Sequence, residues 1–483
     1  MISKRFINTN SLKLFSEKEM TRVSLSQLYT LGRYLLKKKD GSDYKVFEIP
    51  TKFLYKELPI RFSQCIKGMH IGITPYAVHK LPSFRKFMLH YNNDFEKIIN
   101  LPPPQNEPSD KAFMDTLRKI NSFHYSNLSQ INQGLRELSQ AIANNDPEIV
   151  PSYLLPSGKP NMLSAASPAI QDSGNLKWLD TQKSLIQYDI KPNNVATFMN
   201  NNPTFQYAEA RTNKFFDWFY SMCLGSQLLI QDHISVRDHS KSYVQKISPL
   251  NIVHNAVNDA RRIASKHYNI EPPEVVVISP NPQISTVYIP ELLYCIIFEL
   301  IKNSLRATIE FHHLNSKSSN NSSTTMPKLK VIVAEGFEDL TFKVSDEGGG
   351  MPASKVEKLW SYIHQKSMPE NDSNAPPSSQ HPTDSSIKSS SMEANFGNFD
   401  LSFGSNSDYP LFGFGVGLPT ARLIARYFGG DLDVVSMEGY GSDFYLHLQR
   451  SGNIAETTPD LCDLSLQSAS SSVSELIDSL KYE

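Results

Sequence analysis

The chain has 483 residues, of which 40% are apolar, so it can bury a large core and form two or three domains. Its formal net charge is -1, which excludes a global electrostatic attraction to nucleic acid or to an anionic membrane. No apolar run approaches the roughly 20 residues that a membrane-spanning helix needs. The four cysteines form no CxxC pair, which argues against a disulfide framework and against a zinc site.

Residues 1–22 have the composition of a mitochondrial presequence. Lys4, Arg5 and Lys13 carry positive charge among apolar residues, and no acidic residue occurs in the first 16 positions. An ordinary frayed N-terminus explains the same composition equally well. We therefore expect a presequence here, although the composition does not require one.

Apolar residues at helical spacing dominate the N-terminal half, beginning with Leu25, Leu28, Leu31 and Leu35. This pattern predicts a helical region from 25 to about 100, which ends at a proline-rich break. Further helices are expected after the break, and a polar loop rich in Pro, Ser, Asn and Gly separates them. The predicted segments are the break at 101–110, a helix at about 112–143 capped by Ser109 or Asp110, the loop at 144–178, and a helix at about 193–234. Four long helical stretches indicate a four-helix bundle domain over 23–240.

Strands alternate with helices from Ser248 onward, and β-branched residues mark the strands. The expected strands are 274–279, 285–290, 329–336, 339–348, 431–436 and 443–449, and the expected helices are 290–312, 353–364 and 418–428. Interleaved elements of this kind predict an α/β sandwich over 245–450, so the whole chain is of the α+β class.

Two polar segments contain too few apolar side chains to repay the entropy of ordering them. The first is an insertion at 367–408 within the α/β domain, and the second is a Ser-rich C-terminal tail at 451–483. Both are expected to be mobile.

The predicted helix at 298–310 places several polar groups on one face. Glu299, Asn303 and Arg306 stand at i, i+4 and i+7, and Lys302 adjoins this stripe. A carboxylate beside a side-chain amide can polarise a hydroxyl group while the amide oxygen meets a hard cation such as Mg²⁺. The solvated face of an amphipathic helix is the simpler explanation for this helix taken alone.

Three glycine-rich segments follow the helix. In KVSDEGGGMP, Asp346 stands at the end of a strand and is followed by Gly348 to Gly350, whose lack of a side chain permits close backbone approach. In LFGFGVGLPT, glycines at 413, 415 and 417 lead directly into a helix, whose free amides and dipole favour a phosphate group. In MEGYGSD, Gly439 and Gly441 precede Ser442 and a final strand. By itself, a tight turn explains the first segment and a plain hairpin turn explains the third equally well, and GxGxG before a helix also occurs in dinucleotide folds. A Rossmann site is disfavoured because the GxGxG segment stands near the end of the chain.

The order of these four motifs resembles the Bergerat ATP-binding fold of the GHKL superfamily. Within it, ELIKNSLRAT and GFGVGLPTARLIARYFGGDLDVVSMEGYGSD resemble the pyruvate and branched-chain 2-oxoacid dehydrogenase kinases. YKELPIRFSQCIKGM and FFDWFYSMCLGSQLLIQDH in the helical half resemble the same family. The resemblance implies that Asp346 binds the adenine amine, that Asn303 ligates Mg²⁺, and that Glu299 is the catalytic base. The ATP contacts that it implies come from Glu299, Asn303, Arg306, Asp346, Gly348, Gly350, Gly413, Phe414, Gly415, Val416, Gly417, Leu418 and Ser442.

The family resemblance also implies a function. It predicts a serine kinase of the mitochondrial matrix that phosphorylates and inactivates the E1α subunit of the pyruvate dehydrogenase complex, is recruited by an E2 lipoyl domain, and forms a homodimer. The insertion at 367–408 falls at the family's ATP lid. The alternatives are a branched-chain dehydrogenase kinase, a sensor histidine kinase, or a scaffold that ATP only switches.

Two features bear on these alternatives. His233 lies in QDHISVRDH, which differs from the H-E-[LF]-R-x-P phosphoacceptor segment of two-component kinases, so we expect a structural histidine. The C-terminal Asp-Trp motif that joins dimer tails in the pyruvate branch is absent, because the three tryptophans are Trp178, Trp218 and Trp360.

Overall fold

The computed structural model describes residues 9–38, 44–70, 74–151, 154, 203–238, 241–314, 326–363 and 416–459. The insertion at 367–408, most of the predicted polar loop and residues 413–415 lie outside these ranges. None of the helices within them is both long and apolar enough to cross a membrane.

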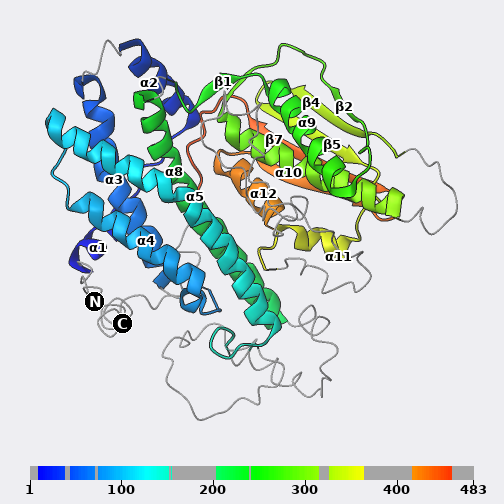
Figure 1. Cartoon of the computed structure of the whole chain (residues 1–483), viewed down its shortest axis with the longest axis horizontal. Coiled ribbons are helices and arrows are strands. Elements are labelled where there is room, and N and C mark those ends of the chain that lie inside the picture. Colours follow the sequence, from blue (N-terminus) through cyan, green and yellow to red (C-terminus); the bar gives the residue numbers. More distant parts are fainter. Residues whose placement is uncertain are drawn as a thin grey trace.

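The described N-terminal part is helical (Figure 1). Its elements are α1 (Thr9–Ser16), α2 (Leu25–Lys38), α3 (Tyr44–His70), the 3-10 helix η1 (Val78–Lys80), α4 (Pro82–Ile99), α5 (Glu107–Ala143) and α8 (Pro203–Asp238). Helix α3 packs against α4 and α8, and α5 packs against the same two helices. On α4, Phe84, Phe87, Tyr91 and Phe95 recur at helical spacing and are all buried, so the predicted amphipathic pattern produces the core.

Helix α5 begins earlier than the sequence suggested. Asn106 is its N-cap and accepts a hydrogen bond from the backbone N–H of Ser109 (3.0 Å), while the Ser109 hydroxyl accepts one from the Asn106 N–H (3.2 Å). The predicted caps Ser109 and Asp110 are therefore wrong. Ser109 completes a reciprocal capping box from inside the helix, and Asp110 forms an ion pair with Arg237 of α8.

The C-terminal part is built on a five-stranded sheet in the order β2-β4-β5-β7-β6, in which β2 and β4 are parallel and the other neighbours antiparallel. Helices α9, α10 and α12 lie against the sheet, and α10 packs on β5 (Figure 1). Its elements are β1 (Gln245–Ile247), α9 (Pro249–Tyr268), β2 (Val275–Ile278), β3 (Thr286–Tyr288), α10 (Pro290–Ile309), the π-helix η4 (Glu310–Leu314), β4 (Leu329–Glu335), β5 (Asp339–Asp346), α11 (Ala353–Val356), the 3-10 helix η5 (Glu357–Trp360), α12 (Gly417–Tyr427), β6 (Asp431–Met437) and β7 (Gly441–Gln449). This mixed sheet covered by helices agrees with the predicted α/β architecture.

Burial alternates along β5 and thereby orients Asp346. Leu340, Phe342, Val344 and Asp346 are buried, whereas the residues between them are not. Because successive side chains of a strand point to opposite faces, Asp346 lies on the same face as the apolar core.

The helix predicted at 353–364 is shorter in the structure. It consists of α11 and η5, after which Ser361 has an extended backbone and ends the helix. The Tyr362 N–H donates to Asn213 Oδ1 (3.0 Å), and the Tyr362 ring stacks on Tyr220 with centroids 5.5 Å apart. The Tyr362 N–H therefore bonds α8 and not a carbonyl of a continued helix.

The tail prediction is wrong for residues 452–458. Ala455 pairs with Ser24 in an antiparallel bridge, and Glu456 is only 1% exposed. At the other end, α1 lies within the predicted presequence, yet Leu12 is buried and Phe15 contacts Phe95 edge-on.

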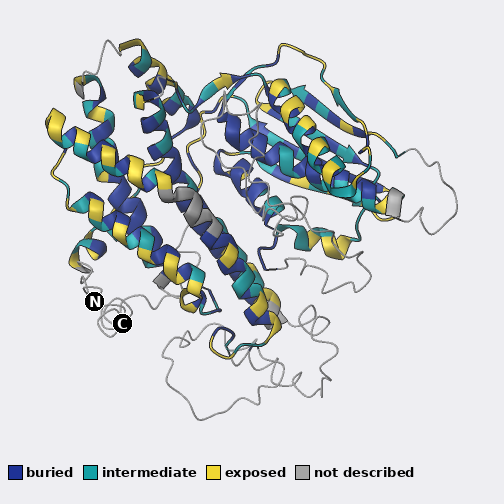
Figure 2. Ribbon diagram, in the orientation of Figure 1, coloured by how far each residue is buried: buried dark blue, intermediate teal, exposed yellow. Residues whose placement is uncertain are grey.

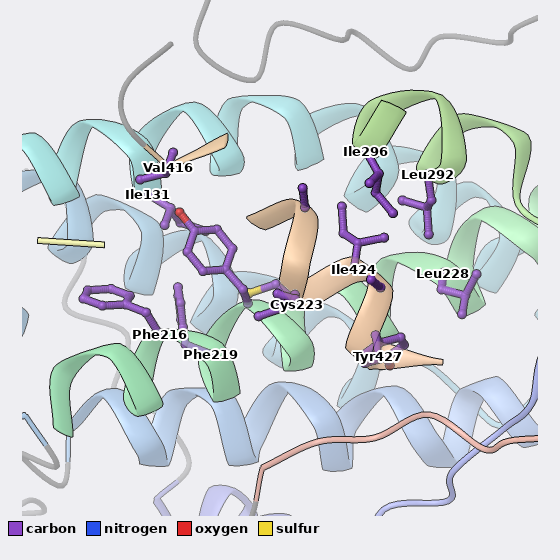
Figure 3. Packing of buried hydrophobic residues seen from close by; sticks show 14 of the residues in the cluster. Ile131, Phe216, Phe219, Cys223, Leu228, Leu292, Ile296, Val416, Ile424 and Tyr427 are labelled. Atoms are coloured by element: carbon purple, nitrogen blue, oxygen red, sulfur yellow. The ribbon is translucent and has the colours of Figure 1, made fainter. Parts of the chain in front are cut away.

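One continuous cluster of buried apolar side chains joins the helical and the α/β parts. Figure 2 shows buried residues where the elements meet, and Figure 3 shows the centre of the junction. There Leu228 of α8 lies near Ile424 and Tyr427 of α12, with Leu292 and Ile296 of α10 beside them. The nucleotide-motif helices α10 and α12 therefore share their core with α8.

Candidate functional site

Helix α10 carries the predicted carboxylate and amide. Lys302 is buried and its Nζ lies 2.5 Å from Glu299 Oε1, so the ion pair fixes one oxygen of the carboxylate. Asn303 stands one turn after Glu299 and is half-buried. Within the described part of the chain, no hydrogen bond engages the Asn303 amide. Both side chains therefore have oxygen atoms available to a ligand.

Helix α12 begins directly against Glu299. A Cβ placed on Gly417 would stand 2.1 Å from Glu299 Oε2, so a side chain on the first residue of α12 would displace the carboxylate. Val416, the N-cap, is buried, and its carbonyl accepts a hydrogen bond from the Thr420 N–H (3.0 Å). The structure thus brings two motifs that are far apart in sequence to one place.

Asp346 lies at the end of β5 beneath α10. It accepts hydrogen bonds from the Ser304 hydroxyl (2.7 Å), the Gly348 N–H (3.0 Å) and the Ser442 N–H (3.3 Å). Burial raises the pKa of the Asp346 carboxyl, and the three hydrogen bonds oppose that rise by favouring the charged form. The network ties the Asn helix, the glycine loop and the β7 turn to one carboxylate.

The glycine loop after Asp346 is pressed between α10 and the β6–β7 turn. A Cβ on Gly348 would stand 2.7 Å from the Ala307 Cβ of α10. Gly350 has φ +62°, and a Cβ there would stand 1.9 Å from the Met437 carbonyl oxygen. Glycine is required at both positions, since any side chain would separate the loop from its neighbours.

Some of the residues predicted to contact ATP are engaged elsewhere or lie outside the described residues. Arg306 Nε donates to Glu310 Oε1 (2.8 Å), so its guanidinium is engaged at the end of α10. Leu418 is half-buried on the first turn of α12. Gly413, Phe414 and Gly415 lie outside the described residues. The structure therefore places Gly417 against Glu299, and it places Gly348 and Ser442 against Asp346. Asn303 stands one turn from Glu299 on the same helix, Val416 and Leu418 flank Gly417, and Gly350 lies against the β6–β7 turn.

Comparisons with known proteins match both halves of the chain. The family model "mitochondrial branched-chain alpha-ketoacid dehydrogenase kinase" matches residues 22–255, and "histidine kinase-, DNA gyrase B-, and HSP90-like ATPase" matches residues 289–452. The chain belongs to the pyruvate and branched-chain 2-oxoacid dehydrogenase kinase family. Its C-terminal domain is accordingly an ATP-binding domain of the GHKL type.

Three curated members of this kinase family illustrate the likeness, and each is named a mitochondrial [pyruvate dehydrogenase (acetyl-transferring)] kinase. The Arabidopsis thaliana protein is 27% identical over 435 residues, covering 88% of this chain and 92% of the relative. The Schizosaccharomyces pombe protein is 37% identical over 249 residues, covering 50% of this chain and 51% of the relative. Human isozyme 1 is 32% identical over 250 residues, covering 49% and 48%. The latter two alignments thus span about half the length of each relative.

The surroundings of His233 do not suit a phosphoacceptor histidine. It is buried between α3 and α8, where its Nε2 lies 3.3 Å from Thr51 Oγ1 and its ring contacts Phe47 edge-on. Burial, and next the charge of Arg237, lower the pKa of His233 to about 3, so the ring is neutral. The surroundings agree with the predicted structural histidine.

Reading the sequence missed Ser304, which bonds Asp346, and Ser436, which supports the loop beside it. Ser304 donates to Asp346, whereas the Ser436 hydroxyl accepts a hydrogen bond from the Met351 N–H (2.8 Å) and lies 2.9 Å from the Ser442 hydroxyl. Ser304 follows Asn303 directly and interrupts an otherwise apolar helix face, and this pattern could have identified it from the sequence. Ser436 lies in a strand with no signal of its own, because only the β6–β7 pairing places it there.

Proposed function

We propose that this protein is a mitochondrial serine kinase that uses Mg-ATP to phosphorylate, and so inactivate, the E1α subunit of a pyruvate dehydrogenase complex. The observation that carries the proposal is the position of Glu299 Oε2 against the first residue of α12. Phosphoryl transfer to a hydroxyl depends on positioning and on stabilisation of charge, and a carboxylate beside a helix start can supply both a base and amides for the phosphates. The names of the relatives supply the substrate.

Glu299 would accept the proton of the substrate serine, since Lys302 holds Oε1 and leaves Oε2 directed at the start of α12. The N-terminal amides of α12 would bind the phosphates, and Asp346 would accept a hydrogen bond from the adenine amine. The Thr420 hydroxyl, one turn into α12, is buried without a partner in the described part of the chain. A buried hydroxyl without a hydrogen-bond partner fits a site in which a bound ligand supplies that partner.

The residues present also fit Mg²⁺ bound together with ATP. The described residues contain no cluster of three or more His, Cys, Asp or Glu side chains that could hold a metal ion. The Asn303 amide oxygen is a hard ligand of the kind Mg²⁺ takes along with phosphate oxygens. When bound, the ion would neutralise charge on the transferred phosphoryl group. We therefore assign Asn303 as the protein ligand.

The domain assignment follows the same reasoning. We infer a presequence within 1–22, a helical domain over 23–240 in which α3, α4, α5 and α8 form a four-helix bundle, a GHKL kinase domain over 245–450 with its lid insertion at 367–408, and a tail at 451–483. The proposed location is the mitochondrial matrix. The proposed partners are the E1α substrate, an E2 lipoyl domain docked on the helical domain, and a second copy of this chain.

A branched-chain dehydrogenase kinase is the second candidate, because the family model that matches residues 22–255 carries that name. Incubating the full chain and Mg-ATP with purified pyruvate and branched-chain E1 separately decides between them. We expect acid-stable phosphoserine on pyruvate E1α. Phosphate on the branched-chain E1 alone would select the second candidate, and phosphate on neither would remove the kinase proposal.

Substitution tests the proposed base. Glu299→Gln should lower kcat at least about 10²-fold, because the amide cannot accept the proton, while the affinity for ATP stays within a few-fold. Glu291→Gln, the same change about two turns earlier on α10, is the matched control and should keep its activity. Full activity of Glu299→Gln would show that another group is the base.

A further inference from the structure

A buried ion cluster lies at the end of α12 that is opposite Glu299. We call Arg61, Glu57, Glu456 and Tyr427 the Arg61 cluster. Arg61 Nε donates to Glu57 Oε1 (3.1 Å) and Arg61 Nη1 to Glu456 Oε2 (3.0 Å). Arg61 Nη2 also donates to Glu456 Oε1, and the Tyr427 hydroxyl donates to Glu456 Oε2. The cluster therefore joins α3, the last turn of α12 and the C-terminal segment.

The cluster is almost completely buried. The side chains of Arg61, Glu57 and Glu456 are 1%, 4% and 0% exposed, so the charged groups interact with one another and not with solvent. Charge pairs this deeply buried persist only where geometry and further hydrogen bonds compensate for lost hydration. Here the Val23 N–H donates to Glu456 Oε1 (3.1 Å) and Arg61 Nη2 to the Thr21 carbonyl (2.7 Å).

Helix α8 closes the cluster from the side through Gly225. A Cβ on Gly225 would stand 2.2 Å from the Tyr427 hydroxyl, 2.4 Å from Arg61 Nη1 and 2.8 Å from Glu456 Oε2. One added methyl group would therefore displace all three groups together. Backbone pairing fixes the C-terminal segment as well, since the Glu456 N–H donates to the Val23 carbonyl (2.8 Å) and the Thr457 N–H to the Tyr427 carbonyl (2.8 Å).

Helix α12 is thus fixed at both ends by groups of different parts of the chain. Gly417 at its start adjoins Glu299, and Tyr427 at its end belongs to the Arg61 cluster. At 1.5 Å per residue the two ends are about 15 Å apart, and a packed helix of this length moves as a rigid body. A shift of the Tyr427 end therefore displaces the Gly417 end relative to Glu299.

We infer that Arg61 and Glu456 are positioning residues for phosphoryl transfer, which act through Tyr427 to hold the start of α12 at the nucleotide. The inference rests on the proposed ATP site, and it adds a dependence of ATP affinity on residues of the helical domain and of the C-terminal segment. Neither Arg61 nor Glu456 contacts the nucleotide centre itself. Their contribution is the placement of the helix that does.

The test measures ATP binding by calorimetry and steady-state kinetics on the full chain. Glu456→Gln keeps the shape of the side chain and removes its charge, Gly225→Ala displaces the cluster, and Arg61→Lys keeps the charge without the planar fork. Asp110→Asn is the matched control, since it breaks an ion pair, only 3% exposed on the Asp110 side, between α5 and α8 away from α12. Each variant is compared at a temperature well below its own unfolding transition.

We expect Glu456→Gln and Gly225→Ala to weaken ATP binding about tenfold, a size consistent with slight misplacement of a binding group. Arg61→Lys should lie between these variants and the wild type. Asp110→Asn should lower the melting temperature while its ATP affinity stays within twofold. If a variant does not fold, Tyr427→Phe, which removes one oxygen atom, takes its place.

ATP affinities within twofold of wild type in folded Glu456→Gln and Gly225→Ala, with lowered melting temperatures, would show that the Arg61 cluster serves stability alone. A wild-type protein that binds ATP and phosphorylates E1α in the same experiment keeps the proposed function intact. Failure of the wild type to bind ATP would instead overturn the proposed function, and the inference with it.

Discussion

Gly417→Ala should disable phosphoryl transfer without unfolding the protein. The added Cβ would stand 2.1 Å from Glu299 Oε2 and 2.8 Å from Glu299 Cδ, so the carboxylate must retreat by roughly 1 Å to regain van der Waals contact. Lys302 restrains that retreat through its ion pair with Oε1. A misplacement of about 1 Å at a reacting group can cost on the order of 10²-fold in rate, so we expect a fall of that size in kcat.

Alanine should not weaken the fold, because it favours a helix over glycine by roughly 0.5–1 kcal/mol. The assay measures phosphate transfer to pyruvate E1α beside thermal unfolding of the same sample. Gly336→Ala, in the β4–β5 turn, is the matched control, because its Cβ would also stand 2.1 Å from a carboxylate oxygen, that of the exposed Asp339 at the start of β5. Activity of Gly417→Ala within twofold of the control would refute the proposed placement of Glu299.

Two further predictions concern buried carboxyls. Asp346→Asn should weaken ATP binding about 10- to 100-fold through loss of a charged hydrogen bond. The ATP affinity of the wild type should fall with decreasing pH, because the raised pKa of Asp346 lets its carboxyl protonate. An ATP affinity of Asp346→Asn equal to that of the wild type in calorimetry would contradict this role. Burial raises the pKa of Asp232 to about 7, so the folded state holds this proton more tightly than the unfolded chain, and stability is lost as pH rises from about 4 to 7. Asp232→Asn should therefore be more stable than wild type at pH 8, by on the order of 4 kcal/mol, and nearly equal at pH 4. Urea unfolding that shows the same difference at both pH values would exclude Asp232 as the cause.

Several local features were readable from the sequence because short-range physics fixes them. Apolar residues at helical spacing predicted α4 and α10, and β-branched runs predicted β4 and β5. The polar stripe on α10 was also predicted correctly, since Glu299 and Asn303 stand one turn apart in any helix. The acid at the end of β5 and the glycines after it needed only strand periodicity and the conformational freedom of glycine.

Other features depended on partners distant in the sequence. The start of α5 was misplaced because Asn106 and Ser109 cap it reciprocally, and either residue is a plausible cap by itself. The segment around Glu456 was predicted to be mobile on composition, yet Arg61 and Val23 bind it in the fold. Composition measures how much apolar surface a segment can bury, and it does not register one charged side chain that completes a buried pair.

The sequence by itself determined which helix carries a carboxylate beside an amide, which strand ends in an acid, and where glycines permit close approach of the backbone. Only the tertiary structure decided that Gly417 meets Glu299, that Ser304 holds Asp346, and that Tyr427 reaches the helical domain. The physical reason is that helix and strand periods arise from neighbouring residues, whereas these contacts arise when separate elements bury their apolar faces in one shared core.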